Sequence, residues 1–178
     1  MFNKKTLALA AFMLGAVTVN PALAEDGPTD MQIAHIAYTA GNLDIRYAHL
    51  ALAKSENPAV RDFAKLMLRD HAAVNEQAVA LLTKLGASPE DNPTSQQLVA
   101  NAKAKRDELA ALDGAAFDRA YAANELGYHQ FVNETVETAF IPAADNKEFK
   151  SLLKSALAVF EVHENHAANM VKSLKAQR

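Results

Sequence analysis

Cysteine is absent from the 178 residues of this sequence. Without thiols the chain has no disulfide framework, no thiolate metal site and no cysteine nucleophile. A chain without cysteine can also cross into an oxidising compartment without mispairing thiols, which agrees with export. Any metal site must therefore be built from nitrogen and oxygen ligands.

Glycine and proline are scarce, six of each, and most of them stand where the pattern of apolar residues is interrupted. No segment alternates apolar and polar residues with period two, which argues against β-strands. Alanine, leucine, lysine and glutamate dominate the remaining sequence. This composition predicts an all-α protein whose helices are separated by short joints.

The formal net charge is −3, and no cluster of basic residues follows the N-terminal segment. This argues against nucleic acid as a partner, because binding to phosphates depends on a positive surface. It also argues against an anionic membrane surface as the main partner. The identity of a partner stays open, and a homo-oligomer is among the alternatives.

The first 24 residues have the three parts of a secretory signal peptide. Lys4 and Lys5 form the positive part, residues 6–19 are apolar, and residues 21–24 end in a small-x-small pattern. The apolar run is shorter than the ~20 residues that span a membrane. We expect cleavage after Ala24, a periplasmic mature chain of residues 25–178, and no stable membrane insertion. An uncleaved N-terminal anchor is the alternative.

The remaining chain divides into five helices, four of them long and amphipathic. We predict helices over residues 30–55, 58–85, 95–112, 115–138 and 147–175. Asp30 is expected to cap the first, Pro58 suits the first position of the second, and Gly86 ends it. The third is short, polar and connecting. The pattern predicts a four-helix bundle with one extra connecting helix, forming a single domain.

Three histidines from three helices are expected to face the core. His71 continues an apolar seam with steps of three and four residues, and His163 lies in a similar seam of the last helix. His129 lies one turn after Glu125 on the inner face of its helix. His166, one turn after His163, lies on the flank of that seam, whereas His35 and His49 are expected at the rim or surface.

These side chains should also lie at similar depths in the bundle. Asp44 and His71 are about equally far from the Asn57–Pro58 turn. If the connecting helix crosses the bundle lengthwise, His129 lies about 15 residues, or roughly 22 Å, from the same end. His163 lies at a similar distance from the C-terminal end. The spacing favours convergence at one level.

The convergence predicts a mid-bundle site for one transition metal ion such as zinc, copper or iron. Its predicted ligands are His71, His129, His163, His166, Asp44 and Glu125, and Asp70 is a further nearby carboxylate. In the alternative interpretation, the histidines form a metal-free buried network with carboxylates or with hydroxyls of Tyr47, Tyr121 and Tyr128. That reading fits an envelope-stress or protein-interaction module.

Enzyme activity is left undecided by the sequence. It contains no Ser-His-Asp spacing, no glycine-rich phosphate loop and no His-Glu-x-x-His motif. A redox enzyme with a mononuclear or dinuclear centre is a third, less favoured interpretation.

Three segments resemble the family called domain of unknown function 4142. They are the pattern Val-x-x-Phe-Ala-x-x-Met-x-x-Asp-His ending at His71, the segment around His129, and the late sequence HENH. The resemblance implies an exported bacterial protein with a ferritin-like fold and no settled activity. His129 matches the second histidine of the family, and His163 or His166 the third. Di-iron ferritin-like proteins use Glu-x-x-His on two helices, which the inward histidines here lack, so ferroxidase activity is doubtful.

Overall fold

The computed structural model describes residues 27–176, and this part of the chain is helical with no strand. The predicted signal peptide lies outside the described residues. The helices, in chain order, are α1 (Asp30–Lys54), α2 (Pro58–Leu85), α3 (Pro93–Ala110), α4 (Gly114–Thr135), the π-helical turn η1 (Val136–Phe140), α5 (Ile141–Ala143) and α6 (Lys147–Ala176). The all-α prediction is confirmed.

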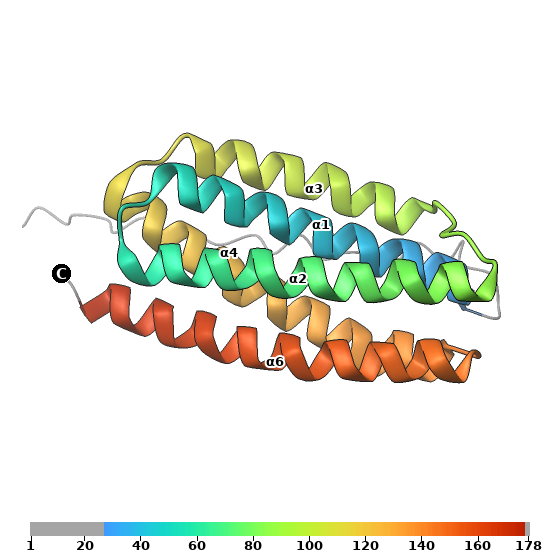
Figure 1. Ribbon diagram of the computed structural model, residues 1–178. Coiled ribbons are helices and arrows are strands. Elements are labelled where there is room, and N and C mark those ends of the chain that lie inside the picture. Colours follow the sequence, from blue (N-terminus) through green and yellow to red (C-terminus); the bar gives the residue numbers. More distant parts are fainter. Residues whose placement is uncertain (1–26, 177–178) are drawn as a thin grey trace, which may run out of the picture.

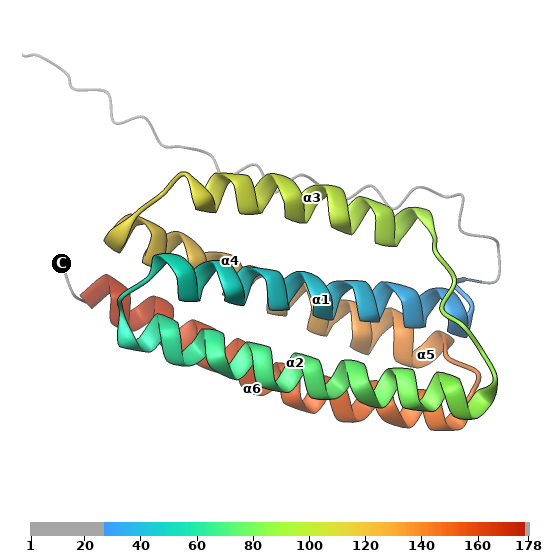
Figure 2. The same cartoon turned by 45° about the horizontal axis from the view of Figure 1, so that its top comes forward.

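Helices α1, α2, α4 and α6 form a four-helix bundle, and α3 lies outside it along α1 (Figures 1 and 2). Helix α2 runs antiparallel to α1, and α3 then runs back along the length of the bundle. As a result α4 begins at the end where α1 turns into α2, and α6 finishes at that end (Figure 1). The predicted lengthwise crossover is confirmed.

The ends of α2 are as predicted. Asn57 caps the helix, Pro58 is its first residue, and Gly86 ends it with a φ of 62°. The predicted cap of α1 is wrong, because Thr29 caps this helix and Asp30 is its first residue. Thr29 and Gln32 form a reciprocal capping box, a pairing that satisfies two backbone N–H groups. The carboxylate of Asp30 instead accepts the backbone N–H groups of residues 145 and 146.

Two other predicted boundaries shift. Helix α3 begins at Pro93, two residues earlier than expected, because Asn92 caps it. Helix α4 ends at Thr135 and continues as η1, whereas we expected one helix to Thr138. Pro142 stands two residues after the end of η1, and a proline within a helix removes a backbone donor and clashes with the preceding turn. Such π-helical segments occur mostly as single turns inside α-helices.

The interior has two apolar cores. The turn-end core, next to the α1–α2 turn, comprises Leu43, Tyr47, Ala48, Ala51, Val60, Phe63, Ala64, Met67, Ala102, Leu109, Phe117, Tyr121, Ala122, Ala167, Met170 and Leu174. The far-end core comprises Ile33, Ala34, Ile36, Leu82, Val136, Phe140, Ala144, Phe149 and Leu153. The seam predicted for α6 is buried along its whole length, at Phe149, Leu153, Ala156, Phe160, His163, Ala167, Met170 and Leu174. The predicted seam of α2 is buried only as far as His71, and Leu85 at its end is exposed.

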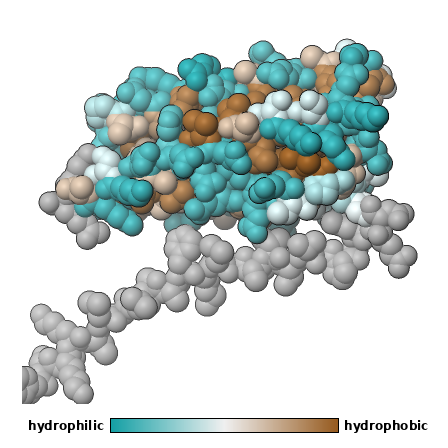
Figure 3. All heavy atoms as spheres, turned by 90° about the horizontal axis from the view of Figure 1, so that it is seen from below, coloured by the Kyte–Doolittle hydropathy of each residue, from teal (hydrophilic) through white to brown (hydrophobic). Residues whose placement is uncertain are grey.

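The surface is mainly polar. The face in Figure 3 is largely hydrophilic, with hydrophobic patches separated by polar residues. Among the described residues, no helix has both the length and the apolar character needed to cross a membrane.

Candidate metal centre

Five ionisable side chains form a buried polar layer in the middle of the bundle. Asp44 comes from α1, His71 from α2, Glu125 and His129 from α4, and His163 from α6. None of these residues is more than 4% exposed. Each of the four helices of the bundle therefore contributes to one layer. This agrees with the prediction that these side chains lie at a similar depth.

The three imidazole rings lie against one another. The ring centroid of His71 is 5.8 Å from that of His129 and 5.4 Å from that of His163, and the last two are 5.4 Å apart. One nitrogen from each ring lies within 4.8 Å of a nitrogen from each of the other two. This spacing is short enough for a single ion at about 2 Å from each nitrogen after small adjustments.

Aromatic side chains hold two of these rings in place. Phe160 of α6 stacks on His71 with a centroid distance of 4.7 Å and an interplanar angle of 10°. Phe63 of α2 and Tyr128 of α4 present their rings to His129 at near-perpendicular angles, each with a centroid distance of 6.3 Å. The rings are therefore oriented by packing as well as by polar contacts, which favours a preorganised arrangement.

Hydrogen bonds fix which nitrogen of two histidines is available. Nδ1 of His129 donates to the backbone oxygen of Glu125 at 2.9 Å, and its Nε2 has no hydrogen-bond partner. Nε2 of His163 donates to Oδ2 of Asp70 at 2.9 Å, and its Nδ1 has no partner. Such second contacts are typical of metal-binding histidines, because they set the tautomer and the ring orientation.

Asp44 contacts two of the rings. Its Oδ2 lies 2.6 Å from Nε2 of His71 and 3.5 Å from Nε2 of His129. Asp44 and His71 therefore form a close buried pair through Nε2, whereas Nδ1 of His71 is buried without a partner. Asp44, Glu125 and His129 also form a second group whose ligand atoms lie within 4.8 Å of one another.

The two buried carboxyl groups have opposite pKa shifts. Burial alone would raise the pKa of Asp44, but the neighbouring His71 and His129 outweigh it and hold this pKa well below its usual range. Burial raises the pKa of Glu125, and the charge of Asp44 raises it further. The layer thus contains one carboxylate and one carboxyl group that retains its proton at higher pH.

Burial also keeps two of the histidines neutral. It lowers the pKa of His129, and it lowers the pKa of His163 to about 4 despite the adjacent Asp70. A neutral imidazole has a lone pair available for a metal ion, whereas a protonated ring must first release its proton. At neutral pH these two rings are therefore in the form that binds metal.

His166 is the predicted ligand that the structure does not bring to the layer. It is exposed, and it lines a groove between α2 and α6 that also contains Arg69. His166 follows His163 by three residues, which is less than the 3.6 residues of a full helical turn. Its side chain therefore points away from the inward direction of His163 and lies on the surface. His163 and not His166 is the inward residue of the HENH sequence.

The tyrosines offered as hydroxyl partners do not hydrogen-bond to the histidines. The hydroxyl of Tyr128 donates to the backbone oxygen of Ala40 at 3.0 Å, and that of Tyr121 is buried without a partner. Carboxylates contact the histidines instead. Asp70 was named as a nearby carboxylate, but its hydrogen bond to His163 was not predicted.

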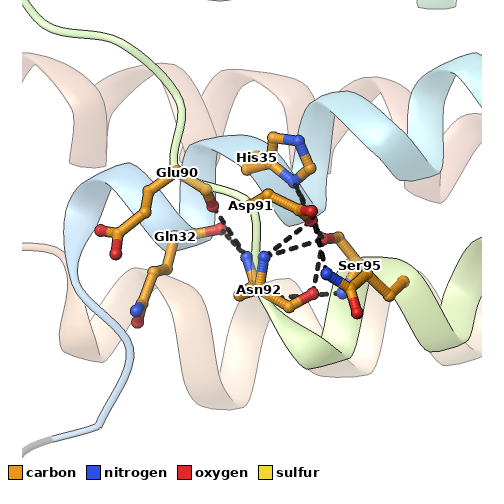
Figure 4. Close-up of polar contacts among 7 residues, drawn as sticks. Gln32, His35, Glu90, Asp91, Asn92 and Ser95 are labelled. Carbon is orange, nitrogen blue, oxygen red and sulfur yellow. Dashed lines mark hydrogen bonds and ion pairs between the residues drawn. The ribbon is translucent and has the colours of Figure 1, made fainter.

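Two histidines lie outside the layer, as predicted. His49 is exposed, and His35 is partly buried at the contact between α1 and the start of α3. Nδ1 of His35 lies 2.9 Å from the hydroxyl of Ser95, which donates to Asp91. Figure 4 shows these side chains together at the start of α3. Ser95 is buried and its hydroxyl also contacts the backbone of Asn92, so this cluster anchors α3 and does not expose a nucleophile.

The sequence profile of the family described as domain of unknown function (DUF4142) matches residues 16–170. The chain belongs to this family. Among solved structures, it is similar to a DUF305 protein from Streptomyces coelicolor that is described as secreted. The TM-score is 0.68 with 12% sequence identity over 85% of this chain and 96% of the other. At this identity the likeness shows the shared helical fold alone. No curated protein matches the DUF4142 chain significantly.

Proposed function

We propose that this DUF4142 protein is exported to the periplasm and binds one transition metal ion in its polar layer, for storage, delivery or sensing. His71, His129 and His163 are the primary ligands, and Asp44 completes the set. The observation that carries the proposal is the convergence of three buried imidazoles from three helices, each with a nitrogen that lacks a hydrogen-bond partner.

The energetics of burial support this interpretation. A buried polar atom without a partner costs about 1–3 kcal/mol, and the layer contains several such nitrogens and oxygens. A cation among them would accept the nitrogen lone pairs and offset the buried charge of Asp44. The combination of imidazole and carboxylate ligands suits zinc, copper or iron.

The ligand pattern favours holding an ion over ferroxidase chemistry. Di-iron proteins of this fold have a glutamate three residues before a histidine on two helices, plus two further glutamates. In this chain Leu68 and Phe160 stand three residues before His71 and His163. The carboxyl groups of the layer are Asp44 and Glu125, fewer than that chemistry uses.

A metal-free interaction or envelope-stress module is the second candidate. Two contacts favour it, since Asp44 lies 2.6 Å from His71 and Asp70 accepts a hydrogen bond from His163. In that case the layer is a polar network that specifies how the helices align, and the chain acts through its surface.

Elemental analysis of tag-free mature protein, purified from the periplasm without chelators, separates the two candidates. We expect about one equivalent of zinc, copper or iron per chain, and a lower melting temperature after chelation. His71→Ala should lose the metal, whereas His49→Ala, which alters an exposed histidine of α1, should retain it. Protein without metal, with a melting temperature that chelators do not change, would instead support the metal-free module.

A further inference from the structure

Asp70 connects the buried layer to the protein surface. Its side chain is 20% exposed, whereas that of its partner His163 is 1% exposed. The two are joined by the 2.9 Å hydrogen bond from Nε2 of His163 to Oδ2 of Asp70. Solvent therefore reaches a carboxylate that directly contacts one of the proposed metal ligands.

Arg69 covers this carboxylate with two hydrogen bonds. Its Nε lies 2.6 Å from Oδ1 of Asp70, and its Nη2 lies 3.2 Å from Oδ2. The Arg69 side chain is 72% exposed. Pairs between exposed side chains are weak and open readily, so the guanidinium can leave Asp70 without disturbing the fold.

A groove of about 680 Å³ lies beside this pair, between α2 and α6. Arg69 lines it from α2, and His166 lines it from α6. Phe63 lies in the same groove and also contacts the ring of His129. Phe63 is therefore common to the groove and the metal centre, and Arg69 connects the groove to Asp70, which contacts His163.

We infer that metal ions enter and leave the polar layer through the α2–α6 groove, and that Arg69 controls the rate by covering Asp70. This inference rests on the proposed metal-binding function. An arriving cation meets His166 in the groove, where it can be held briefly. While Arg69 occupies Asp70, its positive charge repels the cation and its hydrogen bonds engage both carboxylate oxygens. When Arg69 swings away, Asp70 can hold the ion beside the ring of His163, and the ion then moves past this ring to Nδ1.

The test is a stopped-flow measurement of Co²⁺ uptake and release by the metal-free mature protein, followed by visible absorption. Four proteins are compared: wild type, Arg69→Ala, Asp70→Asn and the double variant. Lys65→Ala is the matched control, because Lys65 lines the same groove one turn earlier but pairs with Asp62. Circular dichroism checks that every variant keeps the helical content of the wild type.

We expect Arg69→Ala to accelerate uptake and release together by about two- to fivefold, the range of an exposed ion pair, with an unchanged equilibrium affinity. Lys65→Ala should match the wild type. In the Asp70→Asn background, Arg69→Ala should not change the rates further, because the carboxylate that Arg69 covers is already replaced.

Two different results would overturn the inference. If the wild type binds Co²⁺ in full amplitude but Arg69→Ala has unchanged rates, the gate is wrong while the metal site stands. If the wild type shows no Co²⁺ binding at all, both the metal site and its gate fall. An equal acceleration in Lys65→Ala and Arg69→Ala would also contradict a specific gate, since it would reflect the charge of the groove alone.

Discussion

The polar layer and the apolar cores on either side of it follow different rules. In the turn-end and far-end cores, apolar side chains are removed from water and packed, which stabilises the fold directly. In the layer between them, ionisable groups are buried and several of their nitrogens and oxygens lack hydrogen bonds. Burial of this kind costs stability in the metal-free protein. The contrast teaches that the two ends of the bundle stabilise the fold, whereas its middle contains the ionisable groups of the proposed metal site.

The prediction with the largest expected effect replaces the buried Asp44–His71 pair with apolar residues. We expect Asp44→Val with His71→Leu to abolish metal binding and to leave the metal-free protein equally stable or more stable, by up to about 4 kcal/mol. The reason is that apolar side chains of similar volume avoid the desolvation cost of the pair. Urea denaturation of chelator-treated protein measures the change.

The control replaces an apolar residue of the turn-end core. Phe117 is fully buried and stacks on Tyr121 with a centroid distance of 5.9 Å. Phe117→Ala should cost about 3–5 kcal/mol and leave the metal content at one equivalent. If the double replacement in the layer destabilises as much as Phe117→Ala does, the layer is a stabilising network and the contrast is broken.

The second prediction concerns the pH dependence of the metal-free protein. His129 and His163 have pKa values lowered by burial, so unfolding takes up protons as the pH falls from about 6.5 towards 4. Their contribution to stability is therefore lost in acid. Glu125 acts in the opposite direction, because its pKa is raised in the folded state and unfolding releases its proton.

His163 alone, with its pKa lowered to about 4, should lose about 2 kcal/mol of stability between pH 7 and pH 5. Glu125→Gln removes the opposing contribution, so this variant should lose more stability than the wild type over the same pH range. Urea midpoints of both proteins at pH 5, 6 and 7 provide the measurement. A pH profile that Glu125→Gln leaves unchanged would mean that Glu125 is ionised in the folded protein.

The smallest prediction compares two glycines that flank the layer. A Cβ atom on Gly41 would lie 2.7 Å from Oδ1 of Asn75 on α2, whereas one on Gly127 meets nothing within 4 Å. Gly127→Ala should therefore raise the free energy of unfolding by about 0.5–1 kcal/mol, the usual gain in a helix. Gly41→Ala should fall short of that gain, and Asn75→Ala should restore it. Equal gains at both glycines would show that α1 and α2 do not need this close approach beside Asp44.

Much of this layer was predictable because helical periodicity specifies which side of a helix faces inward. His163 continues a seam in α6 that is buried throughout, and His71 belongs to the buried half of the seam in α2. The equal distances of Asp44 and His71 from the Asn57–Pro58 turn correctly predicted that they lie at the same level, and in the structure the two side chains are in contact. Periodicity could not resolve His163 from His166 in advance, because residues three apart lie close to the same face.

Other features depended on contacts between segments distant in the chain. Nothing in the local sequence shows that Asp30 holds the joint before α6, so the choice between Asp30 and Thr29 as cap was made wrongly. The hydrogen bond between Asp70 and His163 joins residues 93 positions apart. The sequence indicated Asp70 as a nearby carboxylate, but it could not show which histidine this residue contacts.

The sequence by itself determined the helical architecture, the inward faces and the family, because these follow from periodicity, capping residues and a motif within short stretches of chain. Only the tertiary structure decided which nitrogens lack partners, which carboxyl group keeps its proton, and where the layer approaches the surface. Those properties depend on distances between side chains of different helices and on how completely water is excluded from them. Neither quantity is a property of any one helix.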